Sequence, residues 1–157
     1  MRGKSDRVVL LLATGCGLGY SPVASGTVGT LPGVVLAVGL CSFGWVVQVA
    51  VCVALTLVSI TICDRADRIF GVKDDGRIVA DEYLTFPICA IGLPLLTHPW
   101  LIPAAFVVAR IMDIVKIPPA DQAQEIPGGT GIVLDDMIAN IYALGLLHLG
   151  LRVVPGL

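Results

Sequence analysis

Charged residues are scarce in this sequence. Asp, Glu, Lys and Arg make up 14% of its 157 residues, whereas 56% are hydrophobic and the mean hydropathy is +0.91. A water-soluble domain typically has about 25% charged residues. The composition therefore argues against a soluble protein and indicates a single domain, residues 1–157, embedded in a membrane.

Other protein classes are also poorly supported. The formal net charge of −2 does not favour nucleic acid as a partner. The five cysteines form no Cys-x-x-Cys pair, have no histidine at metal-ligand spacing, and mostly fall inside apolar runs. We interpret them as small buried hydrophobic residues rather than redox or metal-binding groups. The sequence contains no detectable internal repeat.

Long uncharged runs supply the candidate membrane segments. The strongest is 44–63, whose twenty residues are about the number that crosses a hydrocarbon layer roughly 30 Å thick. Further apolar segments cover 31–43 and 137–151. The 27 residues of 83–109 carry no charge but include four prolines, and residues 96–100 look like a turn with an interfacial tryptophan. We therefore predict a helical hairpin there.

These segments predict an all-α fold, an integral membrane bundle of about five apolar helical segments. A Gly/Pro-rich loop precedes them and is re-entrant in one interpretation. The two hairpin arms are shorter than the roughly twenty residues of a full crossing, so they either extend into polar flanks or thin the bilayer. If 83–109 were instead one kinked span, Glu82 and Arg110 would lie on opposite faces.

The charges divide unequally between the two faces of this bundle. All 12 acidic residues and nine of the 10 basic ones lie in the N-terminal tail or at four segment ends on one face, and only Arg152 lies on the other. Because Lys and Arg are retained on the cytoplasmic side, we expect the charged face to be cytoplasmic.

Two groups of charges extend into apolar sequence on that face. Asp81 and Glu82 directly precede an uncharged run, and ordinary compensation of the helix dipole would explain either residue alone. Arg110, Asp113 and Lys116 recur every three residues, so a helix places them in one stripe. Facing lipid would be costly, and the stripe is therefore predicted to face the bundle interior or its polar mouth.

The third group is GGTGIVLDD, residues 128–136, at the start of the last apolar segment. Neighbouring residues on a helix diverge by about 100°, so Asp135 and Asp136 cannot make identical contacts. We expect one to hold a ligand and the other to brace its neighbours. The preceding glycines allow the backbone to approach a charged group closely.

Together these groups suit phosphate chemistry. Clustered carboxylates are the hard oxygen ligands that Mg²⁺ prefers. Arg110 and Lys116 are suited to a phosphate, the arginine as a fork and the lysine as a point charge. A metal beside a phosphate monoester can generate a nucleophile from bound water at neutral pH. Direct attack by a carboxylate on phosphorus is the alternative.

Four blocks, in this order and spacing, resemble the bacterial phosphatidylglycerophosphatase A family. They are GCGLGYSPVASGTVGT (15–30), DDGRIVADE (74–82), RIMDIVK (110–116) and GGTGIVLDD (128–136). The resemblance implies a multi-pass, Mg²⁺-dependent phosphatase of the bacterial cytoplasmic (inner) membrane, with its active site on the cytoplasmic face. Its expected reaction removes the terminal phosphate of phosphatidylglycerol phosphate, leaving phosphatidylglycerol and inorganic phosphate.

The resemblance also implies roles for individual residues. The N-terminal block carries Ser21, Pro22, Gly26, Thr27 and Gly29, and the acidic motifs include Asp74. The expected metal ligands are Asp81, Glu82, Asp135 and Asp136. The expected catalytic residues are Asp81, Asp113 and Asp136, and the expected substrate-binding residues are Thr27, Arg110 and Lys116.

Three departures from the family pattern bear on substrate fit and rate. Residues 116–119 read Lys-Ile-Pro-Pro instead of Lys-Pro-Trp-Pro, Gln124-Glu125 replaces an Asp-Arg pair, and Ala80 stands where tryptophan is common.

Two rival functions are an ion-coupled transporter and a CDP-alcohol phosphotransferase. A transporter usually places charges near mid-membrane, whereas the middles of these segments are uncharged. The transferase would need D-x₂-D-G-x₂-A-R, which DDGRIVADE does not supply.

Overall fold

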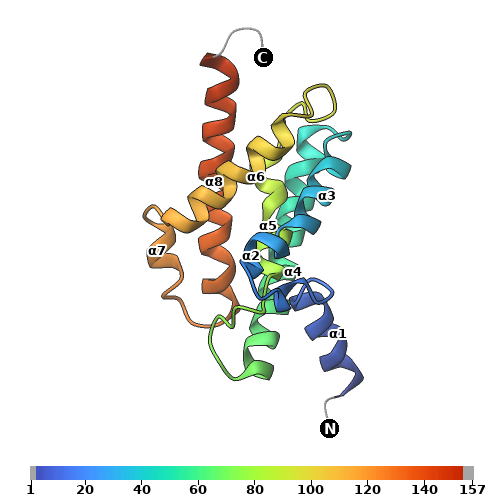
Figure 1. Cartoon of the computed structure of the whole chain (residues 1–157), viewed down its shortest axis with the longest axis vertical. Helices are drawn as coiled ribbons and strands as arrows, with labels where there is room; N and C mark the ends of the chain where they lie inside the picture. Colours follow the sequence, from blue (N-terminus) through green and yellow to red (C-terminus); the bar gives the residue numbers. More distant parts are fainter. Residues whose placement is uncertain (1–2, 154–157) are drawn as a thin grey trace.

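All regular secondary structure in residues 3–153, the part that the computed structural model describes, is helical (Figure 1). The elements are α1 (Lys4–Ala13), the 3₁₀ helix η1 (Leu18–Tyr20), α2 (Ser25–Gly29), α3 (Leu31–Leu40), α4 (Trp45–Phe70), α5 (Ala80–Thr85), the 3₁₀ helix η2 (Phe86–Ala90), α6 (Leu101–Val115), α7 (Ala120–Ala123) and α8 (Gly129–Val153). The prediction of an all-α fold is confirmed.

Two of these helices, α4 and α8, are long and apolar enough to cross a membrane. α4 ends at Gly71, whose positive φ of 74° is readily adopted by glycine and turns the chain out of the helix. The prediction of about five such segments is not confirmed, since α3 and α6 are shorter.

The first arm of the hairpin predicted within 83–109 is not one continuous helix. After Thr85 the chain tightens into η2, which has Pro87 near its start. Proline lacks a backbone N–H and its ring clashes with the carbonyl of residue i−4, so an α-helix does not pass through it undisturbed. The predicted turn before the next segment is confirmed, because α6 begins at Leu101 and His98 N bonds to Pro94 O in the turn that precedes it.

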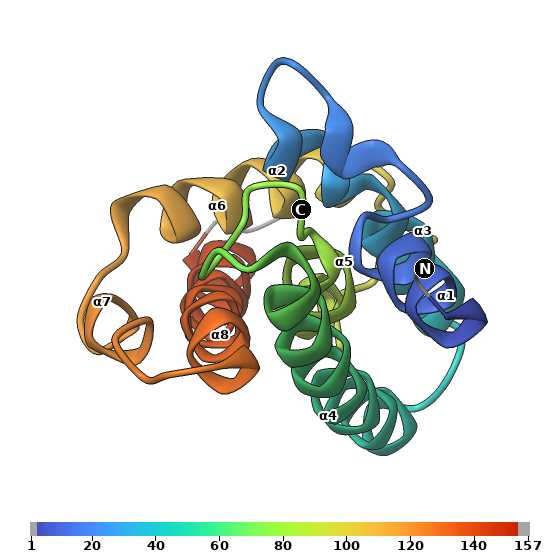
Figure 2. The ribbon, with the colours of Figure 1, turned by 90° about the horizontal axis from the view of Figure 1, so that it is seen from below.

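The short α5–η2 segment forms the centre of the bundle. Seen from below, α5 is surrounded by α4, α8, α6 and α3, with α2 beyond (Figure 2). All five residues of η2 are buried, and Phe86 packs against Phe106 of α6 with ring centroids 6.2 Å apart. Because α5 begins in the middle of the fold, the residues at its first turn lie inside the bundle.

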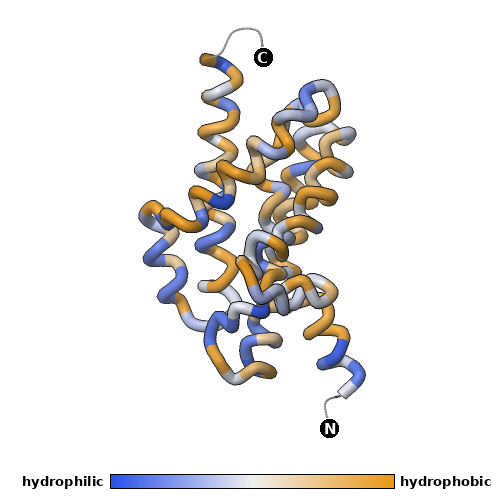
Figure 3. Tube along the Cα trace, in the orientation of Figure 1, coloured by the Kyte–Doolittle hydropathy of each residue, from blue (hydrophilic) through white to orange (hydrophobic). Residues whose placement is uncertain are grey.

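α4 is apolar outside and polar inside. Its outer face exposes large hydrophobic residues, including Val53 and Leu57, whereas Gln48, Thr56 and Ser59 are buried. A helix with this pattern suits an apolar solvent better than water. Hydrophilic residues gather instead over the lower half of the molecule (Figure 3).

Candidate active site

The first turn of α5, the end of α6 and the first turns of α8 converge on one polar cavity of about 180 Å³. It also receives residues from α2 and from the loop between α4 and α5. Its lining comprises Ser25, Asp74, Gly76, Ile78, Asp81, Glu82, Asp113, Lys116, Ile132, Asp135 and Asp136. The structure therefore brings together all of the acidic residues singled out from the sequence.

The loop between α4 and α5 contains Asp74, and it positions Asp81, the second residue of α5, at the cavity. It is held in place by an ion pair between Asp75 and Arg77 (2.6 Å) and by a hydrogen bond from Val79 N to Ala13 O (2.8 Å). The hydrogen bond from Arg77 lowers the pKa of the Asp75 carboxyl below its ordinary value. These contacts fix the start of α5, and with it the direction of the Asp81 side chain.

The start of α8 packs closely against α4, and this contact requires glycine. A Cβ atom on Gly129 would overlap the backbone carbonyl of Ile60 in α4, so only glycine fits this contact. The next two turns then place Asp135 and Asp136 inside the bundle, where they are 6% and 5% exposed. The expected close approach of the glycine cluster to a charged group is present, since Gly129 N donates a hydrogen bond to Asp64 Oδ1 of α4 (3.4 Å).

Lys116 and Asp135 form the first of two ion-pair systems. Lys116 Nζ lies 2.7 Å from Asp135 Oδ2 and donates a second hydrogen bond to Gln124 Oε1 (2.9 Å). Burial lowers the pKa of Lys116, but the hydrogen bond and charge of Asp135 outweigh it and the net shift is upward. Gln124, a departure from the family pattern, thus contacts a predicted site residue.

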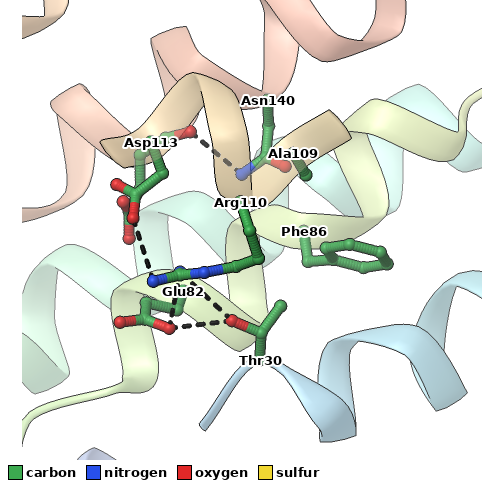
Figure 4. A pocket seen from close by; sticks show the side chains of 8 residues that line it. Thr30, Glu82, Phe86, Ala109, Arg110, Asp113 and Asn140 are labelled. Atoms are coloured by element: carbon green, nitrogen blue, oxygen red, sulfur yellow. Dashed lines mark hydrogen bonds and ion pairs between the residues drawn. The ribbon is translucent and has the colours of Figure 1, made fainter. Parts of the chain in front are cut away.

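Arg110 is the centre of the second system (Figure 4). Its Nη1 donates to Glu82 Oε2 (2.9 Å) and its Nη2 lies 3.1 Å from Asp113 Oδ2. Thr30 Oγ1 donates to the same Glu82 oxygen (2.8 Å). The predicted inward-facing stripe is confirmed, but the guanidinium is held between two carboxylates and is absent from the lining of the 180 Å³ cavity.

The Gly/Pro-rich N-terminal block lies against this system. A Cβ atom on Gly26 would overlap Glu82 Oε1 and lie 2.9 Å from Arg110 Nη2. Ser25 lines the cavity and Thr30 bonds to Glu82. Thr27 does not line this cavity. It is also absent from the lining of a second, smaller cavity, which Arg110 helps to form, and its role in substrate binding stays a prediction.

Three buried carboxylate oxygens of residues lining the cavity have no hydrogen-bond partner among residues 3–153: Asp81 Oδ1, Asp135 Oδ1 and Asp136 Oδ2. Burying such atoms without a partner is costly, so they are suited to a ligand. Burial, together with the charge of Glu82, raises the pKa of Asp81 well above its ordinary value.

These hard oxygen donors fit a divalent cation chemically. Among residues 3–153, however, no three His, Cys, Asp or Glu side chains are already arranged as a metal centre.

Comparison with known proteins agrees with the resemblance seen in the sequence. The sequence model of phosphatidylglycerophosphatase A matches residues 11–151. The chain belongs to the phosphatidylglycerophosphatase A family. No solved structure matches it significantly.

Three relatives show how far the similarity extends along the chain. The phosphatidylglycerophosphatase A of Escherichia coli strain K12 is 33% identical over 144 residues, covering 88% of this chain and 80% of its own. That of Haemophilus influenzae is 38% identical over 136 residues, covering 85% and 83%. A Bacteroides thetaiotaomicron relative, provisionally named a phosphatidylinositol-3-phosphatase, is 31% identical over 150 residues, covering 88% and 90%.

Sequence reasoning missed three polar residues beside the site. Thr30 closes the N-terminal block and offered no signal beyond its position there. Gln124 was noted only as a departure. Asn140 is a lone amide in the apolar run of α8. It is only 7% exposed, so this amide is buried in the bundle and does not face its surroundings.

Proposed function

We propose that the chain is a Mg²⁺-dependent phosphatase that hydrolyses the terminal phosphate monoester of phosphatidylglycerol phosphate, releasing phosphatidylglycerol and inorganic phosphate. The observation that carries this proposal is the set of three buried, unpartnered carboxylate oxygens that share one cavity with Lys116. Membership of the phosphatidylglycerophosphatase A family supplies the lipid substrate.

In this proposal Asp81, Asp135 and Asp136 hold the metal. Bound Mg²⁺ would neutralise phosphate oxygens and lower the pKa of a bound water. Glu82 is the weakest of the expected ligands, since Arg110 and Thr30 already occupy its Oε2. The attacking group is either water or one of the aspartates.

Lys116 is the cation best placed to meet the phosphate. It lines the cavity, 31% of its side chain is exposed, and an ammonium group has three donors of which two are used by Asp135 and Gln124. Arg110 acts differently from our expectation in this scheme. It fixes Glu82 and Asp113 at the edge of the cavity rather than reaching into it.

We further propose that the protein spans the bacterial cytoplasmic membrane several times, through about five apolar segments, with the cavity on the cytoplasmic side. Support comes from the length of α4 and α8 and from the gathering of hydrophilic residues over the lower half of the molecule (Figure 3). Arg152 lies near the opposite end of α8.

A phosphate-release assay tests the proposed reaction. The purified protein, in mixed micelles with phosphatidylglycerol phosphate and no nucleotide, should release inorganic phosphate with Mg²⁺ and not with excess EDTA. Asp81→Asn and Asp136→Asn should lose this activity while remaining folded. Glu125→Gln is the matched control, because Glu125 is exposed and lies outside the cavity.

The same assay separates the alternatives. Phosphate release that is unchanged in both Asn variants would reject the assigned site. Faster release from phosphatidylinositol 3-phosphate than from phosphatidylglycerol phosphate would reject the proposed substrate. A transporter would release no phosphate, and a CDP-alcohol phosphotransferase would require a nucleotide-linked substrate.

A further inference from the structure

A second, much smaller cavity lies beside the first, between α5, α6 and α8 (Figure 4). Its volume is about 10 Å³, which is at the lower end of what one water molecule requires. Arg110, Asp136 and Asn140 contribute to its walls, as does Phe86. Arg110 and Asn140 do not line the larger cavity.

In the part of the chain that the structure describes, three buried polar atoms of these residues have no hydrogen-bond partner: Arg110 Nε, Asp136 Oδ2 and Asn140 Oδ1. Buried polar atoms without any partner are rare and costly, so three from the lining of one cavity call for a common ligand. Asn140 is 7% exposed and Asp136 5% exposed, so bulk solvent cannot readily supply the missing hydrogen bonds.

The orientation of the Asn140 amide is fixed by its nitrogen. Nδ2 donates to Thr85 Oγ1 (3.1 Å) and to the backbone carbonyl of Asp136 (2.9 Å). Exchanging nitrogen and oxygen would place two acceptors against each other at the carbonyl contact, so the amide cannot be flipped. The unpartnered atom of Asn140 is therefore an acceptor.

The three atoms match the hydrogen-bonding capacity of water. Arg110 Nε–H is a donor, whereas Asn140 Oδ1 and Asp136 Oδ2 are acceptors. Water can accept the first bond and donate the other two. A cation would face the N–H of a guanidinium, an anion would face the carboxylate, and a phosphate is too large for the cavity.

We propose that this cavity binds one water molecule, which accepts a hydrogen bond from Arg110 and donates to Asn140 and Asp136. The bound water joins α6 to α8 and orients the Asp136 carboxylate. Each carboxylate oxygen has two lone pairs, so Asp136 remains able to bind another ligand from the larger cavity. This inference does not depend on the proposed reaction.

Radiolytic labelling of the full chain in detergent tests the water directly. Hydroxyl radicals formed from a bound water oxidise side chains beside it, even those that solvent does not reach. Phe86 is 2% exposed and should nevertheless be oxidised, whereas Leu93, also 2% exposed and outside the lining of this cavity, should not. Asn140→Leu removes the acceptor and fills the space, and should reduce Phe86 oxidation several-fold.

Thr85→Val is the matched control for that variant. It removes one partner of the Asn140 nitrogen but leaves the oxygen and the cavity, so Phe86 oxidation should persist. Equal oxidation in the native chain and Asn140→Leu, or none in the native chain, would overturn the proposal. If Asn140→Leu does not fold, a density map of the native chain decides. It should show one peak about 2.7–3.2 Å from both Arg110 Nε and Asn140 Oδ1, and a map that resolves other buried waters but not this one refutes the site.

Discussion

Lys116 Nζ lies 2.7 Å from Asp135 Oδ2, joining the end of α6 to the second turn of α8. Within residues 3–153, Asp136, the next residue, has no ion-pair partner, and its Oδ2 has no hydrogen-bond partner. This contrast matches the expectation that two adjacent aspartates diverge in role. Asp135 braces the lysine through Oδ2 and keeps only Oδ1 for a ligand, whereas no ion pair engages Asp136.

Lys116→Met should therefore damage both stability and activity. The variant keeps the length of the side chain but leaves a buried Asp135 charge without its partner, which costs about 1–3 kcal/mol after allowing for the partial exposure of the lysine. Loss of a charge facing phosphate should lower kcat/KM by about 100-fold or more. Thermal unfolding and phosphate release measure the two effects.

Lys73→Met is the control for this prediction. The Lys73 ammonium group donates a hydrogen bond to the backbone oxygen of Gln124 (2.9 Å), and the side chain does not line the cavity. Because Lys73 lies outside the cavity, we expect activity within about twofold of the native chain. A twofold change corresponds to much less than the roughly 1.4 kcal/mol in activation free energy that changes a rate tenfold. A Lys116→Met enzyme as active as Lys73→Met would remove the lysine from the mechanism.

The Glu82–Arg110 pair should show strong energetic coupling. Arg110→Met leaves the largely buried carboxylates of Glu82 and Asp113 without their shared cation and should cost about 3–5 kcal/mol of unfolding free energy, whereas Glu82→Gln leaves Arg110 its ion pair with Asp113 and should cost less. The double variant removes both charges, so its loss should be smaller than the sum of the two single losses. Chemical denaturation of all four proteins measures this difference, and simple additivity would show that the pair contributes nothing.

Gly26→Ala tests the close approach of the N-terminal block to that pair. The added methyl group would overlap Glu82 Oε1, so either α2 or the glutamate must move. We expect kcat/KM to fall about tenfold or more, because small displacements of site residues have large kinetic effects.

Gly39→Ala, in α3, is the matched substitution, since no described residue lies within 4 Å of the position that its added methyl group would take. It should stabilise the helix by about 0.5–1 kcal/mol and leave phosphate release unchanged. Equal activities for the two alanine variants would mean that the N-terminal block does not support the site.

Local rules predicted part of this site. Charged residues avoid lipid, so clusters beside apolar runs were expected to converge, and they line one cavity. The three-residue spacing of Arg110, Asp113 and Lys116 correctly predicted an inward stripe. Both inferences depend only on neighbours in the chain and on the cost of burying charge.

Other features depend on tertiary packing and had no local signal. The pairing of Arg110 with Glu82 joins residues 28 positions apart. The change from α5 to η2 follows from Pro87, but the position of that segment at the centre of the bundle follows from the packing of α4, α6 and α8 around it. This central start of α5 is what makes Asp81 and Glu82 site residues instead of ordinary dipole-compensating acids.

Removal of the proposed metal should reveal the cost of the unpartnered carboxylates. A ligand that binds only the folded state stabilises it by about 2.7 kcal/mol at 100 times its Kd, so Mg²⁺ should raise the Tm of the native chain and EDTA should lower it. Asp136→Asn removes a buried charge, and its Tm in EDTA should therefore exceed that of the native chain in EDTA. The same variant should gain little from Mg²⁺, because a ligand has been lost. Glu125→Gln should respond to Mg²⁺ as the native chain does. An Asp136→Asn protein that is stabilised by Mg²⁺ as strongly as the native chain would place the ion away from this cavity.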